Sequence, residues 1–463
     1  MAAINIISKK ELSTDLRLDP EFYHPEYVEL LNQLTEIKSK TISYYSPTIT
    51  RGKLPKYFED GKIGVIKSAK IQDGLIDESN EFTDENFIKS NSDCEVVEGD
   101  ILINSTGRGT LGRSAYFNKR DLNYIIDGHI TKISDLKGIS KYYLAIYLLS
   151  KYGRVQLDTM ARGSSGQIEI YPYDIGTVLI PEINKKTIDE VESICKDLYQ
   201  QLESTKKYYE EAEQELLARI QWSKLDISHN LGYSITSSII DSDLRLDPEY
   251  YQPKFNRMLN HLKKLGSEKL SNFCTNIKRG VSPSYIEDGD IFIVNSKDLG
   301  EDGIIKIYDL EKTNDEFYYN DSNENARLNQ YDVLVYATGA YIGRTNCWLE
   351  TDKALAGLDC MILKPDPDIC NPIYLALFLN SPAGRMQADQ KASGSAQRHL
   401  YPDDLLKYEI FLPKDKNGKI DIFWQNQIAN KIKKSYSVKI TAKENLRRAI
   451  DLVEKEIETQ IKN

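Results

Sequence analysis

Three glycines in the first half of the chain have the spacing of a dinucleotide-binding loop. Gly107, Gly109 and Gly112 match the pattern G-x-G-x-x-G, in which small residues let the backbone approach a pyrophosphate. That fingerprint needs a strand before it and a helix after it, whereas residues 114–117 (Ser-Ala-Tyr-Phe) have the composition of a strand. A related segment has Ala340-Tyr341 in place of the middle glycine. The sequence therefore predicts a turn that brings the backbone close to a ligand or a neighbouring strand.

Two other short motifs resemble parts of catalytic sites. Asn371-Pro372-Ile373-Tyr374 is close to the loop with which adenine methyltransferases hold a flipped base, but it lacks the second proline. It aligns with a helix start at 140–143, so we predict that Asn371 is a helix cap. Asp60-x-Lys62 faintly resembles a nuclease metal site, yet the matching position in the other half is Asp290. Because the sequence also has no Walker lysine loop, no G-x-S-x-G and no H-E-x-x-H, we predict no catalytic residue and no metal site.

The chain consists of two related halves. Residues 15–23 (Asp-Leu-Arg-Leu-Asp-Pro-Glu-Phe-Tyr) return 228 positions later as residues 243–251, with Tyr for Phe. Further pairs follow in the same order at offsets of 228 to 232: Arg51-Gly52 with Arg279-Gly280, Asp60-Gly61 with Asp288-Gly289, Thr106-Gly107 with Thr338-Gly339, Gly112-Arg113 with Gly343-Arg344, Tyr143–Ala145 with Tyr374–Ala376, Tyr171-Pro172 with Tyr401-Pro402, and Ile180-Pro181 with Leu412-Pro413. Two like-folded halves tend to pack around a pseudo-two-fold axis, and such a molecule suits a target in two separated parts.

The composition is that of a globular protein with two large units. The chain has 463 residues, 40% of them hydrophobic and 28% charged, with no apolar run of spanning length. Six cysteines without a C-x-x-C pair indicate reduced thiols, and with the absence of a signal-like N-terminus they predict a cytoplasmic protein without membrane partners. The net charge of −10 disfavours a self-sufficient nucleic-acid binder, although residues 51–70 and 101–120 are locally basic.

Local patterns predict an α+β fold in each half. Asp19-Pro20 and Asp247-Pro248 are helix starts, with proline at the first helical position. Short β-rich segments follow, then helices over 141–152 and 372–387, and then strands that end at Pro181 and Pro413.

Each half ends in a long helix with an apolar stripe. In the first helix, spacings of three and four residues alternate without a slip through Ile188, Val191, Cys195, Leu198, Leu202, Thr205, Tyr209, Ala212 and Leu216. This is the seam of a coiled coil. The second helix, about 424–461, has a looser stripe through Ile428, Ile432, Ala442, Leu446, Ala449, Val453 and Ile457. We expect the two helices to pack together in antiparallel directions as a rigid spacer of roughly 54 Å; the alternative is that each helix only packs against its own domain.

These motifs, in this order and repeated twice, resemble the specificity (S) subunit of type I restriction–modification systems. The resemblance rests on Arg17–Tyr23, Ser105–Arg113, Gly163–Gln167, Tyr171–Ile175 and Pro181, which return as Arg245–Tyr251, Ala337–Arg344, Ser393–Gln397, Tyr401–Leu405 and Pro413. A helix of about 35 residues follows each set. The resemblance covers essentially the whole chain.

The resemblance implies a fold, a function and partners. It implies two globular target-recognition domains, residues 1–182 and 226–414, each reading one half of a split double-stranded DNA site, with spacer helices at 183–225 and 415–463. The helices would dock modification (methyltransferase) subunits, expected as two copies, and a restriction subunit where one is present. S-adenosylmethionine, ATP and magnesium would then bind to those partners and not to this chain. The seam residues Leu198, Leu202, Tyr209, Leu446 and Val453 are the candidates for contact with the partners.

Candidate base-reading residues follow from a comparison of the halves, because two different half-sites need different side chains on a shared frame. We align Lys53, Lys56 and Lys67 with Ser282, Tyr285 and Asn295, and Arg108 with Ala340 or Tyr341. Arginine and lysine suit guanine, and glutamine and asparagine suit adenine. The full set is Arg51, Lys53, Lys56, Lys67, Arg108, Arg113, Arg162, Gln167, Arg279, Tyr285, Asn295, Tyr341, Arg344, Gln397 and Arg398. For each one the alternative is an ordinary solvated loop residue, and Arg113 and Arg344 are equally suited to internal ion pairs.

Two other functions fit the same sequence. One is a protein-interaction scaffold or phage-defence adaptor with the same fold, which the acidity favours slightly. The other is a fused nuclease or methyltransferase, for which the sequence offers no catalytic residues.

Overall fold

The computed structural model describes residues 22–462 with short gaps. The residues left out within this range are 78, 80, 108, 120–122, 164–167, 237–244, 275, 287, 301–302, 304, 306, 308–309, 340 and 395–396. The predicted helix start at Asp19-Pro20 and the candidate residues Arg108 and Gln167 lie outside the described residues.

The chain divides into two compact units. Unit 1 comprises Met1–Leu202 and Ile440–Asn463, and unit 2 comprises Glu203–Lys439. The long helices α7 (Lys185–Arg219) and α13 (Ile422–Lys462) each contribute one part to unit 1 and the other part to unit 2. Each part of their apolar stripe is buried in the core of its own unit, and the domain boundaries at 183–225 and 415–463 stay a prediction.

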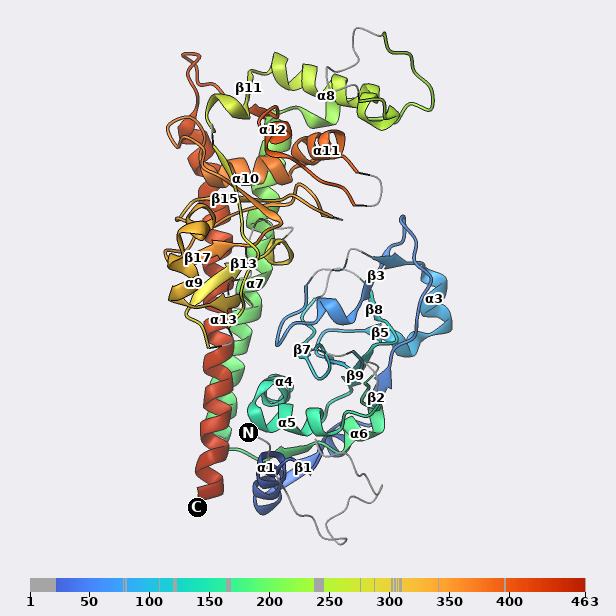
Figure 1. Ribbon diagram of the computed structural model, residues 1–463. Helices are drawn as coiled ribbons and strands as arrows, with labels where there is room; N and C mark the ends of the chain where they lie inside the picture. Colours follow the sequence, from blue (N-terminus) through green and yellow to red (C-terminus); the bar gives the residue numbers. More distant parts are fainter. Residues whose placement is uncertain are drawn as a thin grey trace. The chain divides into compact units, whose positions relative to one another are not determined.

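Unit 1 is a mixed α/β structure built around two small four-stranded sheets (Figure 1). One sheet has the order β2-β9-β6-β7 and is antiparallel throughout, and the other has the order β4-β3-β8-β5 with β3 parallel to β8. Its elements are α1 (Pro25–Glu36), β1 (Ser39–Thr41), α2 (Ile42–Tyr45), β2 (Thr48–Arg51), β3 (Ile63–Ile66), η1 (Ser68–Lys70), β4 (Phe82–Thr83), α3 (Glu85–Ser90), η2 (Ser92–Cys94), β5 (Glu95–Val96), β6 (Ile101–Asn104), β7 (Ser114–Tyr116), β8 (Tyr124–Ile126), β9 (Ile130–Ser134), α4 (Lys141–Leu149), α5 (Lys151–Thr159), α6 (Pro172–Gly176) and β10 (Leu179–Pro181).

Unit 2 repeats most of this order, although its described residues contain no counterpart of β5. Its sheets run β12-β18-β15-β16 and β14-β13-β17, and a β11-β19 pair corresponds to β1-β10 in unit 1. Its elements are η3 (Trp222–Lys224), η5 (Pro248–Tyr251), α8 (Pro253–Lys264), β11 (Ser267–Lys269), η6 (Leu270–Asn272), β12 (Ile277–Arg279), β13 (Ile291–Val294), η7 (Ser296–Asp298), β14 (Glu311–Thr313), α9 (Asp315–Tyr319), η9 (Asp321–Ala326), β15 (Val333–Tyr336), β16 (Thr345–Cys347), β17 (Ala354–Ala356), β18 (Cys360–Leu363), α10 (Pro372–Asn380), α11 (Pro382–Lys391), α12 (Pro402–Leu405) and β19 (Glu409–Phe411).

The sheets β2-β9-β6-β7 and β12-β18-β15-β16, called the main sheets, have an apolar core on each face. Successive side chains of a strand point to opposite faces and so enter different cores. In β6, Ile101 and Ile103 join a core with α4, whereas Leu102 joins a core with residues of β3 and β8. In β15, Val333 and Val335 pack with α10, and Leu334 packs with residues of β13 and β17. The strands between the layers are therefore apolar on both faces.

The two predicted middle helices are each broken in two. The expected helix over 141–152 is α4 followed by α5, and the expected helix over 372–387 is α10 followed by α11. Extended residues separate the pieces, Ser150 at ψ 159° and Ser381 at ψ 162°. Ser150 Oγ accepts a hydrogen bond from Gly153 N at 3.4 Å and so caps α5. Ser381 makes no such cap, and α11 begins instead with Pro382 at its first position.

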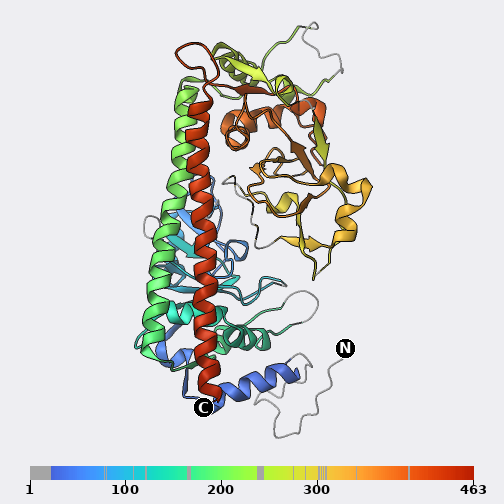
Figure 2. The same cartoon turned by 90° about the vertical axis from the view of Figure 1, so that its left-hand side faces the viewer.

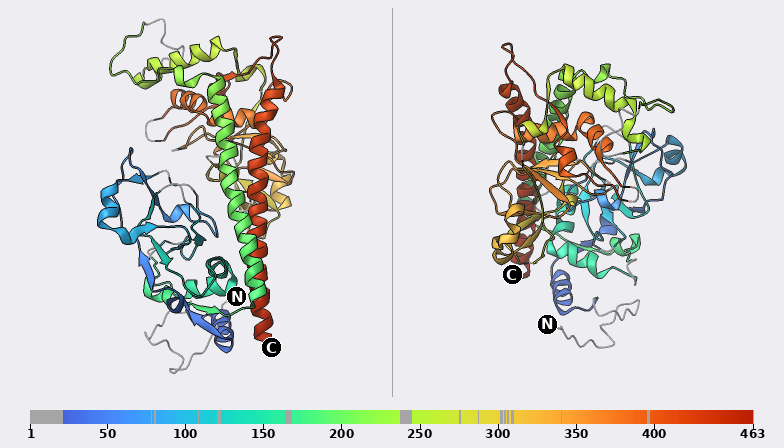
Figure 3. Two further views of the ribbon diagram at one scale, coloured as in Figure 1. Left: turned by 180° about the vertical axis from the view of Figure 1, so that it is seen from behind. Right: turned by 45° about the horizontal axis from the view of Figure 1, so that its top comes forward.

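The long helices run antiparallel to one another within each unit, as Figures 2 and 3 show in green (α7) and red (α13). In unit 1, Glu190 on α7 forms an ion pair with Arg448 on α13 at 2.9 Å. In unit 2, Thr205 O accepts a hydrogen bond from Ser435 Oγ at 3.1 Å. Every residue of the two predicted stripes is buried or half-buried. None of the described helices combines the length and apolarity that crossing a membrane requires.

All six cysteines are buried and free. Burial raises the pKa of the Cys195 thiol to about 12. These residues therefore pack as small apolar side chains.

A buried glutamine fixes the last strand of each unit. Gln156 Nε2 donates to Leu179 O at 3.0 Å, and Gln156 Oε1 accepts from Leu179 N at 2.8 Å. Gln387 makes the same two bonds with Glu409 at 3.0 and 2.7 Å. Pro181 pairs with Ser39 in β1-β10, and Phe411 pairs with Ser267 in β11-β19, so Pro181 and Phe411 are structurally equivalent. The sequence alignment that matched Pro181 with Pro413 was therefore wrong by two residues.

Candidate nucleic-acid interface

One edge of the main sheet in each unit (β2-β9-β6-β7 or β12-β18-β15-β16) gathers the loops that carry most candidate residues. In unit 1 the end of β2, the β6–β7 turn, the segment before β9 and the loop after α5 meet through backbone hydrogen bonds such as Gly107 N to Ile168 O at 3.1 Å. Gly339 N to Arg398 O at 3.0 Å is the matching bond in unit 2. We name the first polar edge (Arg51, Thr106, His129, Arg162, Glu169) and the second polar edge (Arg279, Thr338, Asp359, Ser393, His399).

The glycine-rich segment is the turn of a β-hairpin. It joins the antiparallel strands β6 and β7, so no helix follows it. Gly107, Gly109 and Gly112 have φ values of 101°, 86° and 74°, a conformation that favours glycine. The prediction of a turn that brings the backbone close to a neighbouring segment is confirmed by the Gly107–Ile168 contact.

The repeated Arg-Gly pair places an arginine at the polar edge of each unit. A Cβ on Gly52 would lie 2.2 Å from Asp127 O, and one on Gly280 would lie 2.0 Å from Gly357 O, so only glycine fits at these close approaches. The arginine before each glycine ends strand β2 or β12. The glycine of each Arg-Gly pair is therefore required because no side chain fits beside the neighbouring backbone carbonyl.

In the first polar edge the arginine is held by a carboxylate. Arg51 Nη1 lies 2.9 Å from Glu169 Oε2, and Arg51 Nε donates to Gly128 O at 2.8 Å. The phenol of Tyr171 also donates to Glu169. Hydrogen bonds from Tyr171 and Arg51 lower the pKa of Glu169 from its ordinary value. The positive charge of Arg51 is therefore neutralised locally.

In the second polar edge the equivalent arginine has no such partner. His399 takes the structural position of Glu169. Glu169 forms β-bridges with Thr106 and Arg162, and His399 forms the matching β-bridges with Thr338 and Ser393. Arg279 is exposed, and its guanidinium makes no hydrogen bond or ion pair with any residue that the structure describes. The ring of His399 lies 3.3 Å from Thr338 Oγ1 through Nδ1.

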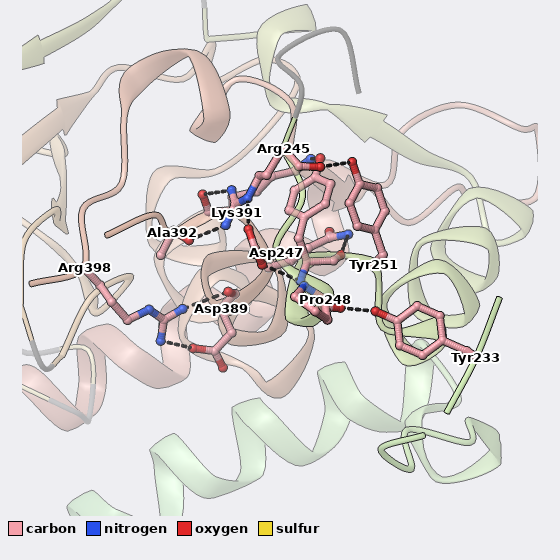
Figure 4. Close-up of polar contacts among 11 residues, drawn as sticks. Tyr233, Arg245, Asp247, Pro248, Tyr251, Asp389, Lys391, Ala392 and Arg398 are labelled. Carbon is pink, nitrogen blue, oxygen red and sulfur yellow. Dashed lines mark hydrogen bonds and ion pairs between the residues drawn. The ribbon is translucent and has the colours of Figure 1, made fainter. Parts of the chain in front are cut away.

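The Arg-Leu-Asp-Pro motif contacts the C-terminal end of α11 (Figure 4). Arg245 donates to Lys391 O at 2.9 Å and to Ala392 O at 2.7 Å, and so caps the C-terminal end of α11. Asp247 pairs with Arg245 at 2.5 Å and accepts a hydrogen bond from Tyr250 N at 2.8 Å. The predicted cap at Asp247-Pro248 is confirmed, although the helix that it starts is the short 3₁₀ helix η5.

Several candidate residues are already engaged in ion pairs. Figure 4 shows Arg398, which pairs with Asp389 on α11 at 3.0 Å. Arg162 pairs with Asp174 at 2.8 Å, and Lys53 pairs with Asp93 at 2.9 Å. Internal carboxylates therefore neutralise these cations, and contact with a phosphate or base requires exchange of the partner.

The remaining candidates of unit 1 are Lys56, Lys67 and Arg113. Lys56 is exposed and has no ion-pair partner among the described residues. Lys67 lies 2.7 Å from Glu81, and Arg113 donates to Gln72 Oε1 at 3.1 Å.

The remaining candidates of unit 2 are more exposed. Tyr285 and Tyr341 are 50% and 53% exposed, and the guanidinium of Arg344 lies 4.2 Å from the centre of the Tyr341 ring. Arg344 also donates to Leu299 O at 3.2 Å, and Asn295 donates to Glu311 at 3.0 Å. Gln397 is exposed.

Backbone register corrects part of the alignment between the halves. Phe58 N and Ile286 N donate to the equivalent carbonyls of Phe82 and Lys312, which makes Tyr57 the counterpart of Tyr285. Lys53 and Lys56 therefore correspond to Val281 and Ser284, and not to Ser282 and Tyr285. The pairing of Lys67 with Asn295 holds, because each residue precedes a 3₁₀ helix, η1 or η7.

The seam residues proposed for partner contact belong to the interior. Leu198 and Val453 are fully buried in the core of unit 1, which also includes Leu446 and is covered by Leu202. Tyr209 packs on the core of unit 2. Leu198, Leu446 and Val453 are therefore closed to a partner, whereas Leu202 and Tyr209 are half-buried.

The structure identifies polar residues that sequence reasoning missed. Glu169 and His399 occupy equivalent places, although one is a carboxylate and the other an imidazole. Thr106 Oγ1 lies 2.6 Å from His129 Nδ1. The only available signal was position, two residues before the repeated Tyr-Pro. Asn371 caps α10 by accepting from Ile373 N at 2.9 Å, as predicted. The described residues contain no cluster of three His, Cys, Asp or Glu side chains suited to a metal ion.

Comparison with known proteins gave matches among solved structures. No protein-family model and no curated protein sequence matches the chain. The type I restriction–modification S subunit from M. genitalium matches with 13% identity over 92% of this chain and 95% of that chain, with a TM-score of 0.37. A structure on complex assembly of the type I R-M system (16%, 91% and 97%, TM-score 0.28) and the HsdS subunit from Thermoanaerobacter tengcongensis (17%, 91% and 96%, TM-score 0.28) also match. The chain thus resembles type I S subunits over most of its length.

Proposed function

We propose that this chain is the non-catalytic DNA-recognition subunit of a type I restriction–modification complex. Unit 1 reads one part of a bipartite site and unit 2 reads the other. The observation that carries the proposal is the duplication: the strands that the two units share have the same order and register, but different side chains occupy equivalent places at their polar edges. A shared frame with different contact groups suits a target with two dissimilar halves.

The local charge supports DNA as the target. The exposed Arg279 and Lys56 are able to contact phosphate or base edges without breaking an internal ion pair. The exposed Tyr285 and Tyr341 add flat surfaces for packing against nucleotides. Because the chain is acidic overall, most of the grip on phosphates then belongs to partner subunits.

The outward faces of the long helices provide the docking surface. Two modification subunits bind there, with a restriction subunit where the system has one, and the helices set the distance between the half-sites. S-adenosylmethionine, ATP and magnesium bind to those subunits. The chain works in the cytoplasm, where the genomic DNA lies.

The test is to co-express the chain with its modification subunit and to map methylated bases across the host genome. A bipartite motif is the expected result, and replacement of residues 226–414 by those of another S subunit should alter one half of the motif only. A motif in one uninterrupted block would contradict the proposal.

A second candidate, a protein-interaction scaffold or phage-defence adaptor, is favoured by one observation. Carboxylates already neutralise Arg51, Lys53, Lys67, Arg162 and Arg398, and the net charge is −10. A mobility-shift assay of the assembled complex at several salt concentrations separates the two. Specific binding that weakens steeply with salt supports DNA recognition, and no shift at any salt supports the scaffold.

A further inference from the structure

Each polar edge has an exposed leucine beside it. Leu54, in the loop after β2, is 72% exposed, and Leu358, in the turn between β17 and β18, is 53% exposed. Leu54 lies three residues after Arg51 of the first polar edge, and Leu358 directly precedes Asp359 of the second. Each unit therefore presents an isobutyl group to solvent at a place where the neighbouring candidate residues are polar.

The two leucines come from different loops but from adjoining points of the shared frame. Strands β9 and β18 begin at Ile130 and Cys360, which pair with the last residues of β6 and β15. The residues two positions earlier, Gly128 and Leu358, are therefore counterparts. A Cβ on Gly128 would lie 3.7 Å from Leu54 N. A side chain at the place of Leu358 would thus start beside the backbone of Leu54.

The two units use these adjoining positions in opposite ways. Ser282 is the counterpart of Leu54, because each lies two residues after the glycine of the repeated Arg-Gly pair. Unit 1 accordingly combines Leu54 with Gly128, and unit 2 combines Ser282 with Leu358. One leucine stands at each edge, while a small residue occupies the other position.

Each leucine is accompanied by a cation that an anionic ligand can reach. Lys56, two residues after Leu54, and Arg279, at the end of β12, meet no carboxylate within ion-pair distance in the described part of the chain. A ligand that suits both groups has negative charges along its backbone and an apolar group beside them. Duplex DNA has this chemistry, with phosphates on its strands and methyl groups in its major groove.

The apolar group that a base edge offers in the major groove is the C5-methyl group of thymine. Guanine, adenine and cytosine present hydrogen-bonding groups there. A leucine placed against those groups would displace their water without supplying a hydrogen bond, which is unfavourable. A leucine therefore favours thymine both by the contact that it makes with the methyl group and by the contacts that it denies to the other bases.

We infer that Leu54 and Leu358 select thymine, each by contact with the C5-methyl group of one thymine in the half-site that its unit reads. The inference rests on the proposed function, because it needs DNA at both polar edges. It assigns an apolar contact to each unit in addition to the hydrogen-bonding candidates. It also predicts a thymine, on either strand, in both half-sites.

The experiment measures the affinity of the assembled complex, with its modification subunit, for duplexes that carry its mapped motif. Uracil replaces the thymines of the motif one at a time, which removes a single methyl group and preserves base pairing. One replacement in each half-site should weaken binding by the parent complex about fourfold, as expected for one buried methyl group. L54S should abolish this penalty in the half-site of unit 1, and L358G in that of unit 2, each without effect on the other half-site.

Two rescue variants exchange the arrangements of the units. L54S/G128L gives unit 1 the arrangement of unit 2, and S282L/L358G gives unit 2 the arrangement of unit 1. A Cβ on Gly128 would meet its nearest neighbour at 3.7 Å, so a side chain fits there. Both double variants should restore a uracil penalty of about fourfold in their own half-site, at the same or the adjacent base pair.

V97S is the matched control. Val97 is an apolar side chain of unit 1 that is 57% exposed, in the segment between β5 and β6. V97S removes exposed apolar surface at another place and should leave both uracil penalties unchanged. Because Leu54, Leu358 and Val97 are all exposed, none of the three single substitutions opens a cavity in a core.

The outcomes separate this inference from the proposed function. A bipartite parent motif that lacks thymine in a half-site, or shows no uracil penalty, overturns the inference alone. A penalty that survives L54S and L358G also overturns it. Loss of the modification subunit from the L54S or L358G complex would mean that the leucine contacts protein, and it overturns the inference as well. A parent complex that produces no bipartite motif overturns the proposed function together with the inference.

Discussion

The two polar edges share a backbone and differ in charge. In the first, Arg51 is bound to Glu169, whereas in the second, Arg279 is exposed and His399 takes the place of the glutamate. The fold fixes where the arginine stands, since the glycine that follows it packs against a backbone carbonyl in both units. A single residue from another loop then decides whether the cation is neutralised. Local charge at such an edge can thus change without any change in the fold.

The largest expected effect concerns the frame that the two units share. Replacing Gln156 by alanine removes the partner of Leu179 N–H and one of the two donors to Leu179 O, which the Tyr147 hydroxyl still contacts; replacing Gln387 removes the side-chain partners of Glu409 N–H and C=O. Each change should lower the free energy of unfolding of its own unit by about 3 kcal/mol. Gln156→Ala should cost more, because Gln156 also donates to the Tyr147 hydroxyl at 2.8 Å.

Denaturant unfolding followed by hydrogen exchange at β10 and β19 measures this effect for each unit. The exposed Gln200→Ala on α7 is the control and should unfold like the parent. Equal losses of protection in both strands from either substitution would show that the two frames are not independent.

The arginines provide the second prediction. R279A should weaken binding of the assembled complex to its motif about tenfold and reduce the slope of log affinity against log salt by about 1, as expected for a lost phosphate contact. R51A should change the slope by much less, because Glu169 already balances its charge. Titrations at four or more salt concentrations give both slopes. A slope change that is as large for R51A as for R279A would refute the distinction between the edges.

A third prediction makes the second edge resemble the first. H399E places a carboxylate where Glu169 stands and should engage Arg279, so affinity should fall a few-fold with a smaller slope. E169H should act in the opposite direction by releasing Arg51. H399Q, which adds no charge, is the control and should retain the parent slope.

The smallest expected effect is a pH dependence confined to unit 1. Hydrogen bonds from Tyr171 and Arg51 lower the folded-state pKa of Glu169 below its ordinary value of 4.5. The ionised carboxylate therefore contributes stability above pH 4.5, and this contribution is lost as the pH falls through the lowered pKa. The difference in unfolding midpoint between the parent and E169Q should shrink over that range, and Y171F should move the transition toward higher pH. A difference that stays constant with pH would contradict the assignment.

The sequence alone determined what repeats and what is apolar. Duplicated motifs predicted two units, and unbroken spacings of three and four predicted α7, because periodicity and repetition are properties of the linear chain. Capping residues at Asn371 and Asp247 were predictable for the same reason, since they act on neighbours a few positions away.

Only the tertiary structure decided which side chains are neutralised, buried or left free. The pairing of Arg51 with Glu169 spans 118 positions, and the break between α10 and α11 depends on how Ser381 is packed. The seam of the long helices turned out to belong to the cores of the units, because apolar spacing identifies a buried face but not what covers it. Contacts between residues far apart in the chain depend on the closed fold, and short-range patterns carry no record of them.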